Sequence, residues 1–476
     1  MPLPLRQRLR PEYAVAFVYC AALFMDIMDT TIVNVALRTM AEDFGRSTSS
    51  IEWVVIGYLL SLAVWIPASG WIGDRFGTKR TILFAIAIFT ISSALCGMSG
   101  SLNQLIAARI LQGVGGGMLA PVGTAMLYRA FPPERRAKAS TVLMIPVVVA
   151  PASGPVLGGL IIEHASWHWI FLVNIPIGVI TFVFGLVMLT EYRERTVTAF
   201  DLPGFVLSAG ALACVLYAVS QGPAAGWGSP EIVISGAIGI ALSVSLVWWE
   251  LRAPEPMLQF RLFSSRMFAR SNLAGVFVYG SFIGVLFLTA LFLQQARGLG
   301  PLDTGLTIFP EALGVISAAQ IVGRIYSRVG PRRLMGFGLI GTAGIMTLFT
   351  QIDAGTNLWL IRGLLYATGF SIAFSFVSLQ VATFATISPA DTGRASAIFS
   401  TVRQASAAAA VALLATVLTS LLPSSAGPDS VGLVASPEVF RAFHRTYLVA
   451  AGLAFIGSAV AWSFRDSDVA HTLKRA

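Results

Sequence analysis

Charged side chains are scarce in this chain of 476 residues, because 12% of them are Asp, Glu, Lys or Arg and 56% are hydrophobic. Soluble domains carry about 25% charged residues, so this balance excludes an ordinary soluble domain. Cysteine is rarer still, with three copies at Cys20, Cys96 and Cys214. All three fall in apolar stretches without the spacing of metal ligands, and we interpret them as small core residues.

Signatures of catalysis are also missing. The sequence has no phosphate-binding loop of the form Gly-x-x-x-x-Gly-Lys-Ser/Thr, no cluster of metal ligands and no histidine near a credible nucleophile. We therefore expect a protein that is not an enzyme and that uses no cofactor and no metal. ATP-driven transport is disfavoured for the same reason.

The dominant feature is a series of fourteen apolar runs. Each run is roughly twenty residues long, which is enough for a helix to cross the core of a bilayer. No short alternating pattern suggests a membrane barrel, and helices satisfy their own backbone hydrogen bonds in lipid. The sequence thus predicts an all-α polytopic protein embedded in the lipid bilayer.

The net charge of +9 has a topological explanation, which argues against nucleic acid as a partner. Most of the 32 Lys and Arg residues lie on one set of loops and tails, as the positive-inside rule describes. This bias predicts that both termini lie in the cytoplasm. The exceptions are Arg38, Arg46, Arg297, Arg441 and Arg445 on the opposite loops, and Arg109, Arg362 and Arg403 within helices.

A basic turn between the second and third apolar runs occurs twice. Gly70, Arg75, Gly77, Lys79 and Arg80 are matched 253 positions later by Gly323, Arg328, Gly330, Arg332 and Arg333, and Arg109 is matched by Arg362. Internal repeats of this kind are typical of secondary transporters. We therefore predict two six-helix bundles around a central cavity, with an extra helix pair at 202–221 and 230–251. The predicted division is 1–195, 196–268 and 269–476.

Six motifs in sequence order resemble the major facilitator superfamily, and in particular its fourteen-helix drug:proton antiporters. They are Asp29-Thr-Thr-Ile-Val-Asn34-Val-Ala-Leu37, Gly70-x-x-x-Asp74-Arg75-x-Gly77-x-Lys79-Arg80, Leu105-x-x-x-Arg109-x-x-Gln112-Gly113-x-Gly115, Gly154-Pro155-x-x-Gly158-Gly159, Trp167-His-Trp-Ile-Phe-Leu-Val-Asn174-Ile-Pro176, and Leu293-Gln-Gln295 with Gly298, Pro301 and Gly305. The resemblance implies a bacterial inner-membrane exporter of amphipathic drugs driven by the proton gradient. Arg38, Ser327 and Glu311 depart from the family pattern or from the repeat.

Asp29 and Arg109 are the predicted proton-coupling pair. Counted from the outer ends of their helices, near Leu37 and Asn103, they lie about 12 Å and 9 Å deep at 1.5 Å per residue. Low dielectric disfavours a buried carboxylate and a nearby guanidinium favours it, so protonation of Asp29 is expected to loosen the pair. The alternatives are a static ion pair that only fixes packing, and a proton shared between Asp29 and Asp26.

Asp26 and Glu311 are the other carboxylates in apolar runs, and we expect one or both to attract a cationic lipophilic substrate in the cavity. An alternative places Glu311 as a solvated charge near the outer mouth. Asn34, Arg403 and Gln404 are further cavity candidates, although Arg403 and Gln404 can equally bond neighbouring carbonyls.

Two other elements are expected to serve the conformational change. In the turn Gly70–Arg80, Asp74 is interpreted as a charge clamp that pairs with a basic group in one access state; the alternative is a turn that serves topology alone. The helix-5 motif Gly154, Pro155, Gly158 and Gly159, with the glycine-rich fourth helix, predicts close backbone approach and a kinked helix sliding on a smooth partner. Static packing is the alternative.

Trp167, His168 and Trp169 are interpreted as an aromatic anchor at the membrane interface. The main alternative to drug efflux is a dedicated exporter of one native metabolite or lipid; an importer and a non-transporting receptor are less favoured. The expected partners are small amphipathic substrates, protons and the bilayer, and a monomer is compatible with the sequence.

Overall fold

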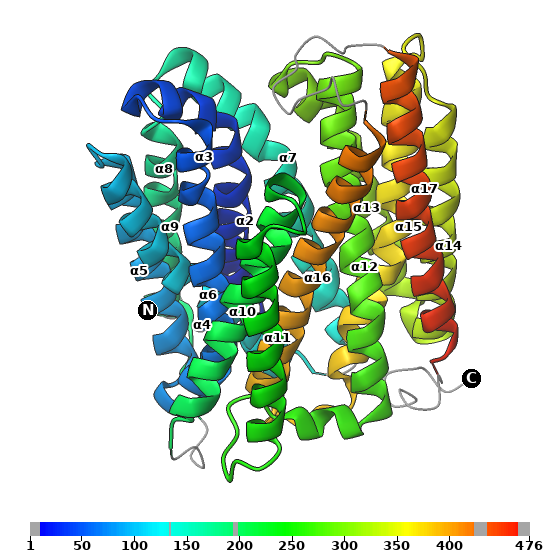
Figure 1. Cartoon of the computed structure of the whole chain (residues 1–476). Coiled ribbons are helices and arrows are strands. Elements are labelled where there is room, and N and C mark those ends of the chain that lie inside the picture. The colour runs from blue at the N-terminus through cyan, green and yellow to red at the C-terminus, as the bar shows by residue number, and fades with distance from the viewer. Residues whose placement is uncertain (1–9, 133–134, 194–198, 423–435, 465–476) are drawn as a thin grey trace, which may run out of the picture. The chain divides into compact units, whose positions relative to one another are not determined.

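The computed structural model of the chain describes residues 10–132, 135–193, 199–422 and 436–464, and within these ranges every regular element is helical (Figure 1). The long helices are α2 (Pro11–Phe44), α4 (Trp53–Phe76), α5 (Thr78–Gly97), α6 (Leu102–Ala130), α7 (Arg136–His164), α9 (Asn174–Met188), α10 (Leu202–Ala225), α11 (Pro230–Glu250), α12 (Arg266–Leu291), α13 (Pro301–Val329), α14 (Pro331–Leu348), α15 (Leu358–Ala385), α16 (Thr392–Leu421) and α17 (Pro437–Trp462). The short elements are α3 (Thr48–Ile51), α8 (Trp169–Leu172), the 3₁₀ turns η2 (Phe260–Ser264) and η4 (Phe349–Gln351), and the π-helical turn η3 (Phe292–Ala296).

Fourteen segments of the described chain are long and apolar enough to cross a membrane, which confirms the predicted number of spans. α8 and α9 together form one of them, Trp169–Met188. The first span is longer than predicted, because α2 continues from Leu37 to Phe44 before Gly45 ends it in the left-handed conformation. Leu37, from which the depth of Asp29 is counted above, therefore lies within the helix and not at its outer end.

The chain forms two compact units. Unit 1 contains residues 1–217, 233–264 and 387–401, and unit 2 contains residues 218–232, 265–386 and 402–476. The division of the sequence at residues 195 and 268 stays a prediction.

The core of unit 1 surrounds the first helix. Ile32, Val33 and Ala36 of α2 are fully buried, and they pack together with residues of α3, α4, α5, α6 and α8. Trp167 belongs to this core, since it is 3% exposed and its indole N–H donates to the Asp43 carboxylate at 2.9 Å. The interpretation of Trp167 as an interfacial anchor is therefore wrong, whereas Trp169 is 56% exposed. Hydropathy cannot separate the two rings, because the buried one is satisfied by a carboxylate 124 residues away.

The two copies of the basic turn have the same backbone geometry. Gly77 connects α4 to α5 with φ 99° and ψ 139°, and Gly330 connects α13 to α14 with φ 83° and ψ 158°. Positive φ is accessible to glycine at little cost and is strained for other residues. The repeat read from the sequence is therefore present in the backbone of both units.

The helix-5 motif lies on α7, which contains Pro146, Pro151 and Pro155 in its interior. Its glycines face α2: a Cβ on Gly154 would lie 2.8 Å from the Thr31 Cβ, and one on Gly158 would lie 3.1 Å from the Ile32 Cγ1. A Cβ on Gly159 would meet nothing within 4 Å. The helix that packs against this motif is thus α2, which carries the candidate coupling carboxylates, and the prediction that the glycine-rich fourth helix, α6, is its sliding partner is wrong.

The extra pair, α10 and α11, forms a hairpin whose two helices lie side by side (Figure 1). Ser235 of α11 donates to the Cys214 carbonyl of α10 at 2.9 Å. In unit 1 the pair packs on α4 through aromatic contacts, with ring centroids 5.6 Å apart for Trp65 and Phe205. This contact attaches the unit 1 part of α10 to α4.

Candidate functional site

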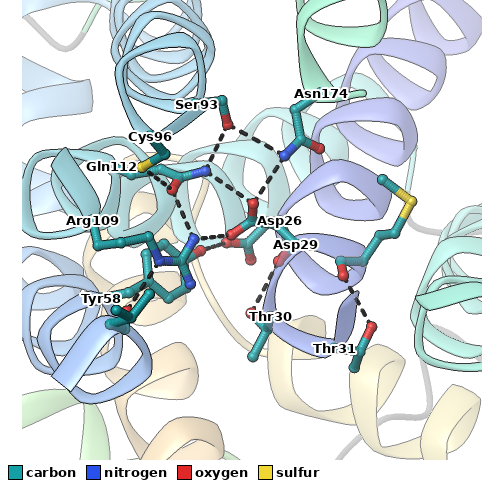
Figure 2. Close-up of polar contacts among 12 residues, drawn as sticks. Asp26, Asp29, Thr30, Thr31, Tyr58, Ser93, Cys96, Arg109, Gln112 and Asn174 are labelled. Atoms are coloured by element: carbon teal, nitrogen blue, oxygen red, sulfur yellow. Dashed lines mark hydrogen bonds and ion pairs between the residues drawn. The ribbon is translucent and has the colours of Figure 1, made fainter. Parts of the chain in front are cut away.

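Two carboxylates project from the middle of α2. Asp29 is fully buried and Asp26 is 7% exposed. They are three residues apart, which places them on one face of the helix. Figure 2 shows polar side chains from neighbouring helices converging on both of them. Charged groups at membrane depth are costly, so this cluster is a functional candidate.

Arg109 of α6 is the cation of the cluster. Its Nη1 forms an ion pair with Asp29 Oδ2, and the side chains of both residues are fully buried. Nη1 also donates to the Gln112 amide oxygen at 2.7 Å, and Nε donates to the Val54 carbonyl at 3.1 Å. The guanidinium lies over the Tyr58 ring, 4.2 Å from its centroid. These contacts hold the charge in one position.

The second oxygen of Asp29 is held by amides. Gln112 Nε2 donates to Oδ1 at 3.1 Å and Asn174 Nδ2 donates to it at 2.9 Å. Both amides also donate to the Ser93 hydroxyl, at 2.7 and 3.2 Å (Figure 2). Helices α2, α5 and α9 thus contribute one polar side chain each, and α6 contributes two, Arg109 and Gln112. Both oxygens of the Asp29 carboxylate therefore accept from buried donors.

Asp26 has a different environment. The Tyr58 hydroxyl of α4 donates to Asp26 Oδ1, so the same phenol binds one carboxylate through its hydroxyl and Arg109 through its face. Two carboxylates therefore lie beside one guanidinium. If both ionise, these two carboxylates carry two negative charges beside the one positive charge of Arg109, and one proton balances the three groups.

Small residues on α6 make this arrangement possible. A Cβ on Gly116 would lie 2.7 Å from the Tyr58 hydroxyl and 3.0 Å from Asp26 Oδ1. A Cβ on Gly113 would lie 2.9 Å from the Leu62 amide nitrogen of α4. Side chains at these positions would force α4 and α2 away from α6, so the glycines permit the close approach that brings the phenol to the carboxylate.

The structure brings Asp29 and Arg109 together, as the sequence argument requires, and adds residues that it did not identify. Gln112 and Asn174 lie inside recognised motifs but were given no role. Tyr58 and Ser93 carry no motif signal, because a tyrosine or serine in an apolar helix is common. Their arrangement depends on which faces of four helices meet, and periodicity does not determine that.

The Gly70–Arg80 turn contains a second buried ion pair. Asp74 Oδ1 accepts from Arg129 Nη2 at 2.8 Å, with both side chains nearly buried. Arg129 Nε donates to the Pro389 carbonyl at 3.1 Å, just before α16 begins. A Cβ on Gly393 would lie 2.8 Å from the Asp74 carboxylate, so the first turn of α16 is close against it. Asp74 therefore joins the turn to two other segments of unit 1.

The backbone that follows Gly77 binds a carboxylate from the segment after α9. Glu191 accepts from the backbone N–H of Lys79 at 2.9 Å and of Arg80 at 3.3 Å, which caps the amino end of α5. The Lys79 ammonium donates to the Leu186 carbonyl at 2.7 Å. A carboxylate at a helix N-terminus is favourable for the helix dipole. Glu191 is a partner of this turn that the sequence argument missed.

The predicted cavity residues have varied environments. Asn34 is exposed and donates to the Thr30 carbonyl at 3.2 Å, and Arg403 and Gln404 of α16 are half-buried. Glu311 of α13 is 1% exposed, so its interpretation as a solvated charge near the outer mouth is wrong. Roles for these residues in substrate binding stay predictions.

The repeat does not reproduce the ion pair in unit 2. Arg362 takes the place of Arg109, but its guanidinium lies over the Trp359 ring at 4.7 Å, and within the described residues it forms no ion pair. Phe282 stands 253 positions after Asp29, so the carboxylate is lost. Among the described residues, a buried ion pair at this position of the repeat is therefore found in unit 1 and not in unit 2.

Known proteins are similar to this chain in sequence or in architecture. Proteins of Escherichia coli O45:K1 (strain S88 / ExPEC) and Shigella sonnei (strain Ss046), both called "Putative multidrug resistance protein MdtD", are 36% identical to the chain over 371 residues, which is 77% of this chain and 78% of each of theirs. The human organic anion transporter MFSD10 (TETRAN) has a similar structure, with a TM-score of 0.64 and 15% identity over 95% of this chain and 100% of that one. The proton:xylose symporter XylE, solved with 6-bromo-6-deoxy-D-glucose, has a TM-score of 0.64 and 13% identity over 95% and 96%.

The two structural likenesses establish the fold alone, because their sequence identity to this chain is only 15% and 13%. The family assignment comes from the sequence, because the profile of the Major Facilitator Superfamily matches residues 19–412. The family match and the fourteen spans together make the chain a multi-pass membrane protein whose substrates are small molecules. It belongs to the Major Facilitator Superfamily, whose members are transporters and not enzymes.

Proposed function

We propose that the protein exports amphipathic drugs or toxic compounds across the bacterial cytoplasmic membrane in exchange for protons, with both termini in the cytoplasm. The observation that carries this proposal is the fully buried ion pair of Asp29 and Arg109 with a second carboxylate, Asp26, beside it. Ionisable groups at membrane depth commonly belong to proton or substrate pathways. The relatives named for multidrug resistance support the substrate class.

In the proposed coupling step, a proton binds the Asp29 carboxylate and converts it into a neutral acid. The attraction that holds Arg109 is thereby lost, and the guanidinium turns toward Asp26. Tyr58 lies between the two positions, because its ring supports Arg109 and its hydroxyl already contacts Asp26. Arg109 thus exchanges one carboxylate for another, so its charge stays compensated. The release of Asp29 from α6 allows α2 to move against α7, along the glycines of the helix-5 motif.

The substrate cavity is proposed to include Asp26, Glu311, Arg403, Gln404 and Asn34. Asp26 is 7% exposed, so a cationic substrate and, once Asp29 is protonated, the Arg109 guanidinium compete for it. Competition of this kind gives exchange, because protonation of Asp29 displaces the substrate from Asp26. A dedicated exporter of one native metabolite or lipid would use the same coupling pair with a different cavity.

The test uses everted membrane vesicles with an imposed proton gradient and a pH-sensitive dye. Addition of lipophilic cations or neutral amphipathic drugs is expected to trigger proton release when the protein is present. Vesicles from the same cells without the protein, and vesicles treated with a protonophore, are the controls. If no compound triggers release although the protein is folded in the membrane, drug:proton antiport is wrong and the dedicated exporter takes its place.

Asp74 is proposed to stabilise the access state in which it binds Arg129. Asp74→Asn removes the charge from a hydrogen bond worth about 1.5–3 kcal/mol, so we expect a tenfold or larger shift away from this state, with about 1.4 kcal/mol per factor of ten. The measurement is the rate and apparent affinity of compound-triggered proton release. Glu42→Gln, in the exposed pair with Arg38, is the matched control and should change neither. An Asp74→Asn protein with the wild-type rate and affinity would show that the turn serves topology alone.

A further inference from the structure

Glu311 is a carboxyl group without a partner. It lies in the interior of α13, where it is 1% exposed, and both of its carboxylate oxygens are buried without a hydrogen-bond partner among the described residues. No ion pair within the described ranges includes it. The other buried carboxylates considered above, Asp26, Asp29 and Asp74, each have a donor or a cation. Glu311 is therefore exceptional in this fold.

The repeat explains where Glu311 lies. It stands 253 positions after Tyr58, and Gly369 stands 253 positions after Gly116. The contacts pair the same positions: a Cβ on Gly116 would meet the Tyr58 hydroxyl at 2.7 Å, and one on Gly369 would clash with the Glu311 carbonyl oxygen and lie 3.1 Å from its Cγ. Unit 2 thus has a carboxyl group where unit 1 has the phenol that touches both Asp26 and Arg109.

The exchange is reciprocal. Tyr279 of α12 stands 253 positions after Asp26, so unit 1 has its acid on the first helix of the repeat and its phenol on the second, whereas unit 2 has the reverse. The Tyr279 hydroxyl accepts from Gln380 Nε2 at 3.2 Å. Both units therefore place one carboxyl group and one tyrosine at the same pair of helical positions.

The charged and titratable groups of the surrounding helices do not neutralise Glu311. On α15, Arg362 lies over Trp359 and is seven residues from Gly369, or about 10 Å along the axis. On α14, Arg332 and Arg333 lie beyond the end of α13, about 27 Å from the level of Glu311 along the helix. Tyr366 of α15 shares a hydrogen bond with Ser317 of α13 at 3.0 Å. Further groups are Arg266 and Arg270 near the start of α12, Tyr279, and Tyr447 of α17, whose hydroxyl donates to Thr289 at 3.2 Å.

Polar side chains lead along α13 toward this carboxyl group. Thr304 and Thr307 precede Glu311 by seven and four residues, so all three lie on one face of the helix. The hydroxyl oxygens of Thr304 and Thr307 are buried and have no partner among the described residues. Threonines in helices usually bond the carbonyl one turn earlier, as Thr342 and Thr368 do here. The stripe therefore places unused hydrogen-bonding groups between the amino end of α13 and Glu311.

We propose that Glu311 is a second proton-binding site, so that one transport cycle moves one proton through Asp29 and Asp26 in unit 1 and another through Glu311 in unit 2. A carboxylate without a partner in this position would be an uncompensated buried charge, whereas a neutral carboxyl group costs much less. Proton binding converts the carboxylate into the acid and needs no other reactant. This inference rests on the proposed antiport.

The protonation state itself is measurable. In infrared spectra of the purified protein at neutral pH, a carbonyl stretch of a protonated carboxyl group is expected that disappears in Glu311→Gln. The same band should survive in Asp303→Asn, which removes an exposed carboxylate from the same helix. Glu311→Gln should also fold as well as the wild type, because it replaces one neutral group with another. Absence of a band assigned to Glu311 would overturn the proposal.

Its role in coupling is tested in proteoliposomes by the substrate gradient at equilibrium. For a neutral substrate and one unit of pH difference, two protons per cycle support a gradient of about 100-fold and one proton about 10-fold, since each factor of ten is 1.4 kcal/mol. Glu311→Gln is expected to lower the gradient tenfold, Glu311→Asp to restore it, and Asp303→Asn to leave it unchanged.

The outcomes separate this inference from the proposed function. A Glu311→Gln protein that reaches the wild-type gradient would show that Glu311 carries no proton, while antiport itself would stand. A wild-type protein that builds no gradient at all from the pH difference would refute antiport and the second site together. Loss of the gradient in both Glu311→Gln and Glu311→Asp, with both proteins folded, would assign Glu311 a packing role.

Discussion

Asp29→Asn is expected to abolish the compound-triggered release of the unit 1 proton, so that release falls to at most the one proton per cycle assigned to Glu311. Asparagine keeps the size of the side chain and keeps an oxygen for Gln112 or Asn174 to donate to, but it has no carboxylate to protonate. The measurement is dye-detected proton release in everted vesicles, with downhill movement of the compound followed in parallel. Downhill movement should persist, because binding and access do not require a titrating group.

Asp26→Asn is the matched control, since it makes the same chemical change three residues away on the same face of α2. We expect it to weaken the binding of cationic compounds more than that of neutral ones and to retain proton release for neutral compounds. If Asp29→Asn retains release and Asp26→Asn loses it, the coupling carboxylate is Asp26. If both retain it, the coupling lies outside α2 and Glu311 is the next carboxyl group to test.

The sequence predicts the fold of this protein well because the bilayer simplifies it. Each helix must satisfy its own backbone and must present about twenty apolar residues, so the number of spans can be counted directly. The 253-residue repeat is also predicted correctly, since Gly77 and Gly330 adopt the same positive-φ conformation at the two turns. Helix ends were predicted less well: α2 extends to Phe44 because apolarity marks the membrane and not the helix.

The site was predictable only where charge is involved. Asp29 and Arg109 stand out because any ion at this depth needs a partner, and few are available. Tyr58, Ser93 and Asn174 do not stand out, because neutral polar residues are tolerated in membrane helices for many reasons. Their roles follow from three-dimensional convergence on Asp29 and Asp26, and the same is true of Glu191 at the basic turn.

Arg109→Leu is expected to have the largest effect on stability. It leaves the Asp29 carboxylate buried with two amides and without a cation, and breaking a buried pair from one side costs about 3–5 kcal/mol. Acidification should recover much of this loss, because protonation removes the uncompensated charge. The measurement is the free energy of unfolding in detergent micelles or bicelles, determined at neutral and acidic pH. Arg362→Leu is the matched control from the repeat, and it should cost less and show no such recovery, because it leaves no carboxylate unpaired.

The double variant Asp29→Asn, Arg109→Leu completes the cycle. If the two side chains form a coupled ion pair, the double variant should be more stable than Arg109→Leu alone, with a coupling energy of about 1–3 kcal/mol. Additive losses would mean that Arg109 is held mainly by Val54, Gln112 and the Tyr58 ring, and that Asp29 is incidental to it. The proposed step depends on this number, because a proton on Asp29 can release Arg109 only by as much free energy as the pair contributes.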